Sequence, residues 1–360
     1  MPRILGKEGQ KVFSIDYIPE YTPFREEVIN DIIDYISTSI SEENYRPIII
    51  AGSSGTGKTL VATKVVNHLV SDDYLSNNVA ATLINATIAN SIYAVIKKIA
   101  GFITPIPERG LSISDIIRRL ETTLTSRRIR YIIALDDADE IIKKERGKLV
   151  YILTRMDEEA HVPLIYPIFI LRDMKVLTAL PDHIRSKIGG PIYKFNPYNR
   201  SQLKEIIRER IEKGLNPGAI SENAIEVSSI NTEVIFGGNA REMINLIYRS
   251  ALYAEKLKLN KIDAEIIRET FFYTFYNNIV NEVRHPLLKE TIKQITEILD
   301  RDEYMISEDH LNRLHKEMNR LGVTRKELLS YLDMLSLEYG YLLKEETYKH
   351  TFIPRRFIEK

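Results

Sequence analysis

Hydrophobic residues between positions 47 and 195 form short runs that are separated by amphipathic stretches. The runs cover residues 47–51, 80–85, 131–135 and 165–171. The stretches between them carry apolar residues at helical spacing. Short apolar runs that alternate with helical patterns predict a parallel β-sheet covered by helices on both faces.

The pattern changes after residue 197, where the strand-like runs disappear and helical periodicity takes over. Four helices are predicted there, over residues 201–213, 221–230, 239–257 and 261–280. His285-Pro286 marks a further boundary, because the residue before a proline is disfavoured in a helix. Beyond it the pattern predicts three helices and then two short strands, over residues 287–299, 307–321, 324–338 and 341–354. We therefore divide the chain into an N-terminal arm (1–15), a sheet domain (16–197), an all-α domain (198–284) and a C-terminal domain (285–360).

The turn after the first predicted strand carries the motif G-x-x-x-x-G-K-[ST], and a helical pattern follows it. Its glycines let successive backbone N–H groups face a polyphosphate, and the helix N-terminus adds partial positive charge. Lys58 is expected to reach the β- and γ-phosphates, and Thr59 to ligate Mg²⁺. In this context the motif predicts a P-loop for ATP or ADP, with the binding residues Gly52, Ser53, Ser54, Gly55, Thr56, Gly57, Lys58, Thr59 and Leu60.

Two carboxylates end the apolar strand at residues 131–135. In a P-loop site the first acid, here Asp136, holds Mg²⁺, and the next, here Asp137, polarises the attacking water. The second acid is normally Glu, and Asp is one methylene shorter. Because a misplacement of about 1 Å can cost on the order of 10²-fold in rate, we expect slow ATP hydrolysis with nucleotide binding preserved.

Arg241 lies in the first turn of the helix that follows Gly237-Gly238. An arginine at this place can reach across to a triphosphate bound in the sheet domain. With a P-loop upstream, this interpretation is favoured over a surface or capping role.

The C-terminal domain has the element order of a winged helix, with two helices joined at residues 321–323 and a hairpin after the second. Thr324 and Glu327 form a T-x-x-E capping box that defines the start of the second helix. In a winged helix that element enters the major groove of DNA, and the wing touches the backbone or minor groove. The predicted contacts are Thr324, Arg325, Lys326 and Ser330 on the helix and Lys349, Arg355 and Arg356 at the wing. Docking of a protein is the alternative, because acidic residues on the same helix dilute the charge.

Composition limits the function classes. Lys plus Arg and Asp plus Glu number 50 each, so any basic surface must be local. The absence of cysteine excludes disulfides, thiol catalysis and Cys-type zinc sites. Without an eighteen-residue apolar run or a signal-peptide pattern at residues 1–10, we expect a cytoplasmic, nucleoid-associated protein that does not enter a membrane. Abundant Lys and Glu without Cys or Trp suggest a thermophile.

With these motifs in order, the chain resembles the archaeal origin-recognition initiators. These are AAA+ ATPases with a C-terminal winged helix and are relatives of the eukaryotic origin recognition complex. The resemblance covers nearly the whole chain and includes segments at residues 17–20, 23–27, 83–86, 107–114 and 195–199. It implies an α/β P-loop AAA+ parallel-sheet domain, an all-α lid and a C-terminal winged-helix domain.

The resemblance also implies a function. It points to an ATP-controlled, sequence-specific protein that binds double-stranded DNA at replication origins and helps to recruit or load the replicative helicase, with other initiator paralogues as further partners. In that family an insertion also touches duplex DNA, which places Arg109, Gly110 and Ser112 near the backbone by analogy.

Two family positions differ in this chain. A polar sensor, usually Asn, follows the strand at residues 165–171, and here the residue is Arg172. A finger arginine is expected near residues 183–189, where Arg185 or Lys187 is available. These differences, together with Asp137, put hydrolysis in question and leave nucleotide binding intact.

Two other functions stay open. A divergent paralogue acting as a transcriptional or plasmid-maintenance regulator, with nucleotide as a structural ligand, would bind DNA sites without loading helicase. A motor or remodeler ATPase would show steady turnover stimulated by a protein partner rather than by DNA.

Overall fold

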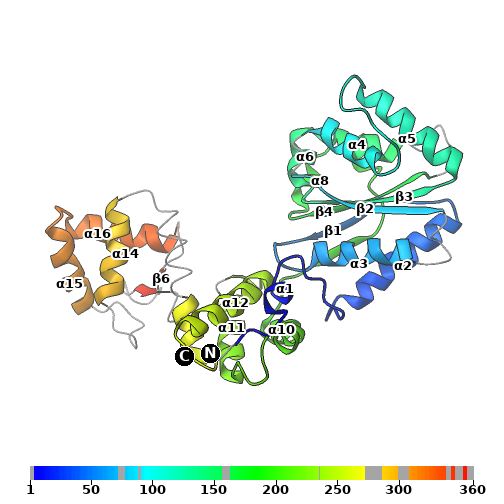
Figure 1. The fold of residues 1–360 in the computed structure, drawn as a ribbon. Coiled ribbons are helices and arrows are strands. Elements are labelled where there is room, and N and C mark those ends of the chain that lie inside the picture. The colour runs from blue at the N-terminus through cyan, green and yellow to red at the C-terminus, as the bar shows by residue number, and fades with distance from the viewer. Residues whose placement is uncertain are drawn as a thin grey trace. The chain divides into compact units, whose positions relative to one another are not determined.

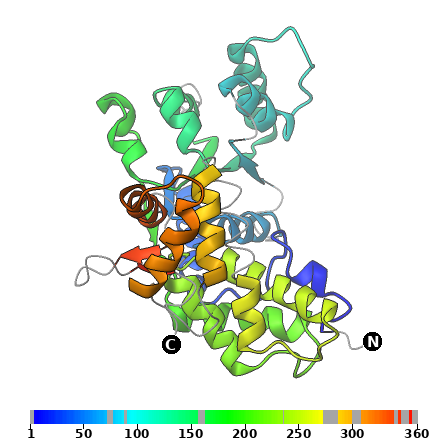
Figure 2. The same cartoon turned by 90° about the vertical axis from the view of Figure 1, so that its left-hand side faces the viewer.

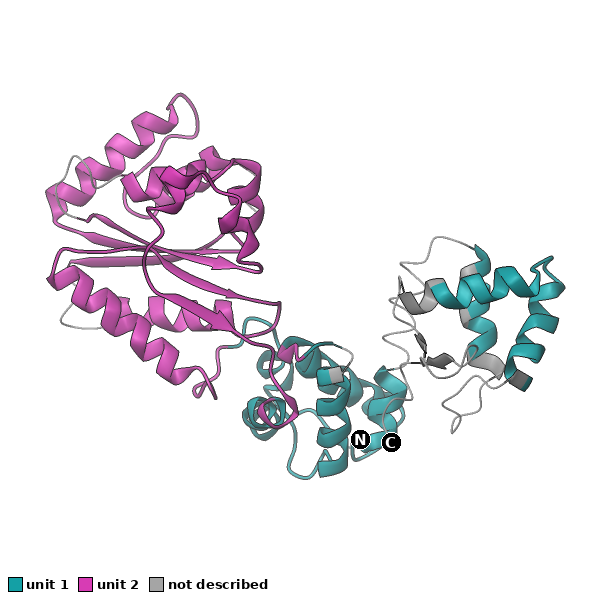
Figure 3. Ribbon diagram, turned by 180° about the vertical axis from the view of Figure 1, so that it is seen from behind, with its two compact units in different colours: residues 1–17, 203–237, 241–360 teal, residues 18–202, 238–240 magenta. Residues whose placement is uncertain are grey.

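The computed structural model describes residues 4–71, 78–87, 91–155, 163–234, 236–271, 286–298, 308–337, 342–344 and 352–354. The chain divides into two compact units, which Figure 3 shows in different colours. Unit 1 comprises Met1–Tyr17, Leu203–Gly237 and Arg241–Lys360, and unit 2 comprises Ile18–Gln202 and Gly238–Ala240. The predicted DNA-contact residue Lys326 therefore belongs to unit 1, and the P-loop belongs to unit 2.

Unit 2 is built on a five-stranded sheet in the order β2-β3-β4-β1-β5, in which every neighbouring pair is parallel. The strands are β1 (Ile48–Gly52), β2 (Val79–Asn85), β3 (Arg130–Asp136), β4 (Ile165–Leu171) and β5 (Ile192–Phe195). The first four coincide with the predicted apolar runs to within one residue. The edge strand β5 was not predicted, because only its last residue is buried.

Helices cover both faces of this sheet (Figure 1). Neighbouring residues of one strand face opposite cores, so Ile48 and Ile50 pack with α2 and α3, while Ile49 and Ala51 pack with helices of the other face. The helices of unit 2 are α2 (Glu26–Ser41), α3 (Lys58–Ser71), α4 (Ile92–Gly101), α5 (Ile113–Arg127), α6 (Asp139–Lys144), α7 (Lys148–Arg155), α8 (Lys175–Thr178) and α9 (Asp182–Arg185). Burial on both faces explains why the strands are apolar throughout.

Unit 1 is mainly helical. Its elements are α1 (Gly9–Val12), α10 (Arg200–Gly214, with its first three residues in unit 2), α11 (Glu222–Val234), α12 (Ala240–Lys256), α14 (Pro286–Ile298), α15 (Glu308–Asn319), α16 (Arg325–Leu337), β6 (Leu342–Lys344) and β7 (Phe352–Pro354). Residues 264–271 form a further described helical stretch. The antiparallel pair of β6 and β7 follows α16, in the order expected of a winged helix.

The N-terminal residues are part of unit 1, although their sequence suggests a polar arm. Ile4, Val12 and Phe13 are buried, and the Phe13 ring stacks on Tyr248 with 5.9 Å between centroids. Figures 1 and 2 show α1 beside α10 and α12. The buried apolar side chains of this segment therefore help to anchor it in unit 1.

The fold class predicted from the sequence is confirmed: a P-loop parallel-sheet domain is followed by a helical region and a C-terminal winged-helix arrangement. Among the described helices, none is long and apolar enough to cross a membrane.

Candidate nucleotide-binding site

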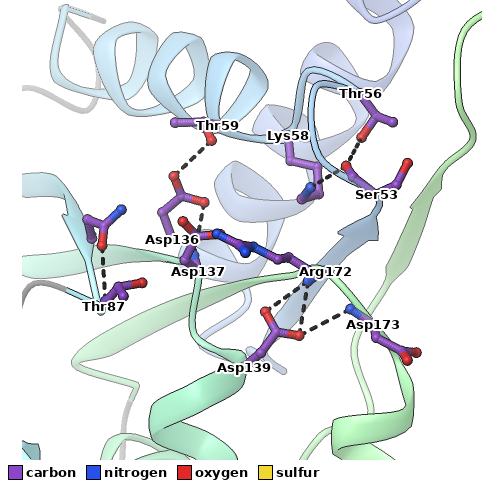
Figure 4. Close-up of polar contacts among 11 residues, drawn as sticks. Ser53, Thr56, Lys58, Thr59, Thr87, Asp136, Asp137, Asp139, Arg172 and Asp173 are labelled. Atoms are coloured by element: carbon purple, nitrogen blue, oxygen red, sulfur yellow. Dashed lines mark hydrogen bonds and ion pairs between the residues drawn. The ribbon is translucent and has the colours of Figure 1, made fainter. Parts of the chain in front are cut away.

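The P-loop connects β1 to α3 at the carboxyl edge of the sheet, next to β4 on one side and β5 on the other. In open parallel sheets, ligands bind outside the carboxyl ends of the strands. The residues that follow β3 and β4 lie at the same edge, and Figure 4 shows them together with the P-loop side chains.

Three glycines of the P-loop have geometric reasons to be glycine. Gly55 and Gly57 have φ angles of +73° and +91°, which L side chains rarely adopt. A Cβ atom on Gly52 would lie 2.3 Å from the Phe195 carbonyl oxygen of the adjacent strand. The loop therefore depends on glycine at each of these predicted positions.

Lys58 is the first residue of α3 and is nearly buried. Its Nζ donates to the Ser53 carbonyl at 2.7 Å, and the Thr56 hydroxyl donates to the same oxygen at 2.9 Å. Burial lowers the pKa of Lys58, while the carboxylates of Asp136 and Asp137 act in the opposite direction. The ammonium is thus a poorly solvated cation, which an anion would stabilise.

Thr59 and Asp136 lie side by side, as their predicted common role requires. The Thr59 hydroxyl donates to Asp136 Oδ2 at 2.8 Å. Asp136 ends β3 and is 7% exposed, and its burial raises the pKa of its carboxyl. Hydroxyl and carboxylate oxygens are ligands that Mg²⁺ prefers, and Mg²⁺ in nucleotide sites commonly takes only one or two carboxylates. These two residues therefore suit a magnesium ion.

Asp137 and Arg172, two positions that differ from the pattern of the initiators the chain resembles, are bonded to each other. Arg172 Nε donates to Asp137 Oδ1 at 2.9 Å. This hydrogen bond is the main cause of the lowered pKa of Asp137. A carboxylate that already accepts from a guanidinium is a weak base. Slow ATP hydrolysis stays a prediction.

Arg25 supports the P-loop from outside the motif. Its guanidinium carbon lies 4.5 Å from the ring centroids of both Phe195 and Tyr198, and its Nε donates to the Thr56 carbonyl at 3.2 Å. The sequence analysis included residues 23–27 in the family resemblance but gave Arg25 no role. Its aromatic partners are about 170 residues away in the chain, so no local pattern indicated the contact.

The segment 238–240 belongs to unit 2 and contacts the P-loop. The Ala240 amide donates to the Gly55 carbonyl at 3.3 Å, and the Tyr198 amide donates to the Gly238 carbonyl at 3.2 Å. The predicted nucleotide ligand Arg241 follows in the first turn of α12, and it falls in unit 1.

Arg185, a candidate finger residue, ends the short helix α9. Its guanidinium bonds to the Asp182 carboxylate one turn earlier and to the Thr178 carbonyl at 3.5 Å. Within unit 2 it is thus engaged in local contacts on an exposed surface.

The described DNA-contact candidates lie in two parts of the chain, at α16 and in the segment before α5. Thr324 caps α16: its amide donates to Glu327 Oε2 at 2.9 Å, and its hydroxyl accepts from the Glu327 amide at 3.3 Å, which confirms the capping box. Arg325 donates to the Asn312 side chain at 3.0 Å. Lys326 and Ser330 are exposed one turn apart on the same helix. Lys349, Arg355 and Arg356 lie outside the described residues.

The candidates of the insertion precede α5. Arg109 and Gly110 are exposed, and Gly110 has a φ of +91°. Ser112 is the N-cap of α5 and exchanges hydrogen bonds with Asp115 in a capping box. The sequence analysis missed this structural role, although the S-x-x-D spacing indicates it. A DNA contact of Ser112 stays a prediction.

Comparisons with known proteins identify a domain family and several similar proteins. Residues 41–167 match the family described as an AAA domain. The ORC1-type DNA replication protein of Desulfurococcus amylolyticus is 29% identical over 359 residues, covering 96% of this chain and 90% of the relative. The ORC1-type protein of Thermoplasma volcanium is 26% identical over 340 residues, covering 92% and 83%.

Solved structures show the same fold. The Aeropyrum pernix ORC1 protein, solved in complex with DNA, has a TM-score of 0.68 at 23% identity, covering 98% of this chain and 93% of that one. Cdc6p from Pyrobaculum aerophilum has a TM-score of 0.67 at 23% identity, covering 98% and 94%. The fold and the P-loop together define an AAA+ nucleotide-binding protein. Within that class, the resemblance to the archaeal origin-recognition initiators is confirmed, and this chain is a relative of the ORC1-type DNA replication proteins.

Proposed function

We propose that this protein is an ATP-binding, sequence-specific initiator that binds double-stranded DNA at replication origins and helps to recruit or load the replicative helicase. The observation that carries the proposal is that one site combines residues suited to bind a nucleotide with a hydrolytic carboxylate that is already engaged by an arginine. Lys58, Thr59 and Asp136 are arranged to bind a nucleotide with its metal ion, whereas Asp137 is tied to Arg172. With slow hydrolysis, the bound nucleotide controls the conformation of the protein rather than supplying energy for continuous turnover.

Each nucleotide-binding residue has a specific role in this proposal. Lys58 neutralises the β- and γ-phosphates, and the loop amides after Gly52 donate to phosphate oxygens. Thr59 and Asp136 would hold Mg²⁺, which offsets phosphate charge when bound. Because the Thr59 hydroxyl already contacts Asp136, little rearrangement is needed to present both oxygens.

Asp136→Asn should remove the dependence of ATP affinity on Mg²⁺. Asparagine keeps the shape and can still accept from Thr59, but it lacks the charge that retains a divalent cation. In titrations with a fluorescent ATP analogue, we expect wild-type affinity to rise about tenfold or more with Mg²⁺, since charge-assisted contacts contribute about 1.5–3 kcal/mol each. The variant should bind equally well with Mg²⁺ and with EDTA. A variant that keeps the full Mg²⁺ response would remove Asp136 from the metal site.

The exposed polar face of α16 and its place before the β6–β7 pair support DNA binding by this helix. The side chains of Leu328 and Leu332 are buried, so the opposite face of the helix is the one that a major groove can receive. A solved relative, the Aeropyrum pernix ORC1 protein, is in complex with DNA, which supports this assignment.

The proposal is tested by footprinting the full chain on DNA flanking its own gene and on the host's replication origins, with ATP and with ADP. We expect discrete protection at repeated sites and a pattern that changes with the nucleotide. No protection above random DNA would overturn the proposal and favour a protein-docking winged helix. Discrete protection without helicase recruitment would favour the regulator instead.

Lys326→Ala tests whether α16 contacts the phosphate backbone of DNA. Loss of one phosphate contact should weaken binding to all sequences and reduce the slope of log affinity against log salt by about one. Lys143→Ala, an exposed lysine on α6 of unit 2, is the matched control and should leave the slope unchanged. If both variants behave alike, Lys326 does not contact phosphate.

A further inference from the structure

The chain passes between the two units at four places. Two of these lie inside helices, after Gln202 in α10 and after Ala240 in α12, and a third follows Gly237. The fourth follows Tyr17, in the stretch between α1 and α2, where residues 13–25 form neither helix nor strand. Because no regular element holds this fourth link, its length and the contacts of its ends decide how much movement it allows.

The first end of the link is fixed in unit 1. The Tyr17 carbonyl accepts from the Arg210 guanidinium at 3.2 Å, and the Tyr17 hydroxyl donates to Glu209 Oε1 at 3.0 Å. The Arg210 guanidinium carbon also lies 4.9 Å from the centre of the Tyr17 ring. Charge-assisted hydrogen bonds are stronger than neutral ones, and Arg210 is only 7% exposed. Tyr17 is therefore firmly attached to α10.

The second end of the link is fixed in unit 2. Lys64 Nζ donates to the Glu20 carbonyl at 2.7 Å, and Lys64 lies on α3, the helix that starts at the P-loop. Further along, Arg25 Nε donates to the Thr56 carbonyl of the P-loop at 3.2 Å. The link therefore leads from α10 to the elements that form the predicted phosphate site.

Only Ile18 and Pro19 separate the two fixed ends. Consecutive Cα atoms are about 3.8 Å apart, so the Cα atoms of Tyr17 and Glu20 can be separated by at most about 11 Å. Pro19 has a restricted φ angle and also limits the conformation of Ile18. The Ile18 side chain is exposed, so it contributes little to packing at either end. The link is thus short and stiff.

A short link of this kind limits bending where α10 crosses between the units. Arg210 lies seven residues beyond Leu203, which corresponds to about 10 Å along the helix. A bend at the crossing therefore displaces Arg210, and Tyr17 with it, relative to unit 2, while Glu20 stays with Lys64. Only two residues can take up that displacement.

We propose that residues 18–19 are a tether that limits the movement of unit 1 relative to unit 2. Under the proposed function, a bound nucleotide shifts the protein among the conformations that are populated. The tether determines which conformations these are. The limit itself is independent of nucleotide, and only the nucleotide response rests on the proposed function.

The test measures the distance between spin labels in the two units by double electron–electron resonance. The chain has no cysteine, so Val70→Cys on α3 and Leu252→Cys on α12, both exposed, provide the only labelling sites. Insertion of Gly-Ser-Gly-Ser between Ile18 and Pro19 adds up to about 14 Å of reach and retains the residues that fix both ends. Without nucleotide, this insertion should broaden the distance distribution about twofold, because a flexible linker replaces a stiff one.

Two further variants separate the tether from a general effect of insertion. The same four residues between Pro217 and Gly218, in an exposed turn within unit 1, are the matched control and should leave the width unchanged. Pro19→Gly keeps the length and removes only the stiffness, so it should broaden the distribution by a smaller factor. If the insertion after Ile18 leaves the width equal to that of the control, residues 18–19 are not a tether.

A second arm adds the Mg²⁺ complex of β,γ-imido-ATP. The distribution of the labelled chain without an insertion should become narrower, whereas the chain with the insertion after Ile18 should bind the analogue within about threefold and lose at least about half of the narrowing. Full narrowing in the insertion variant would contradict the tether. A labelled chain that binds the analogue without any change would contradict the switch in the proposed function, while the widths measured without nucleotide still decide the tether.

Discussion

Lys58→Ala should abolish ATP binding while the fold is preserved. Lys58 is the cation that the P-loop offers to the β- and γ-phosphates, and it is nearly buried at the start of α3. Two charge-assisted hydrogen bonds at about 1.5–3 kcal/mol each correspond to a loss on the order of 10²-fold or more in affinity. Equilibrium titration with a fluorescent ATP analogue measures this loss directly.

The fold should tolerate the change because the lysine charge is unfavourably placed without an anion. Burial is the main influence on Lys58 and lowers its pKa, so removal of the ammonium relieves a desolvated charge. We expect the melting temperature to stay within a few degrees of wild type. Lys64→Ala, on the same helix, is the matched control: its Nζ bonds to the Glu20 carbonyl and should not affect ATP affinity. If Lys58→Ala binds ATP within a few-fold of wild type, the P-loop assignment is wrong.

The central sheet could be predicted because its strands are buried on both faces. Strands of this kind read as continuous apolar runs, and β1, β3 and β4 match the predicted segments closely. The edge strand β5 exposes Ile192 and Lys194 and has no such signal. Prediction from hydrophobic pattern thus succeeded for the three inner strands and for the edge strand β2, and it failed for the other edge strand, β5.

The site divides in a similar way between local and distant features. The P-loop and the carboxylates after β3 are local motifs, and the structure brings Thr59 and Asp136 together as expected. The bond between Asp137 and Arg172 joins residues 35 positions apart, and it depends on β3 and β4 being neighbours. Strand order is a property of the whole sheet, so the motif and the family resemblance identified both residues as unusual without indicating that they form a pair.

The N-terminal segment shows a further limit of pattern reading. The sequence suggests a polar arm there, yet the amides of Ile4 and Leu5 donate to Glu255 on α12 at 2.8 Å and 3.0 Å. Arg210 of α10 completes the attachment. Its guanidinium donates to the Val12 carbonyl, to the Ser14 carbonyl at 3.1 Å and to the Tyr17 carbonyl at 3.2 Å. Because the side chains that hold this backbone lie far away in the chain, the sequence of the segment itself does not indicate the attachment.

Arg210→Ala should destabilise unit 1 by about 3 kcal/mol, because it leaves three carbonyls without their donor and removes a nearly buried side chain. The guanidinium also lies 4.9 Å from the centre of the Tyr17 ring, and this cation–π contact would be lost. Burial lowers the pKa of Arg210 to about 10, so the side chain is still charged at neutral pH and the hydrogen bonds are charge-assisted. Chemical denaturation measures the loss of stability.

Hydrogen exchange tests whether the loss is located where the contacts are. In Arg210→Ala, the amides of residues 4–17 should exchange faster, whereas those of the sheet in unit 2 should keep their protection. Arg208→Ala is the matched control, because Arg208 lies on the same helix and forms an exposed ion pair with Glu205, so its removal should cost less than about 1 kcal/mol. Equal effects of the two substitutions would show that Arg210 does not anchor the N-terminal segment, and that the buried apolar side chains of that segment hold it without help.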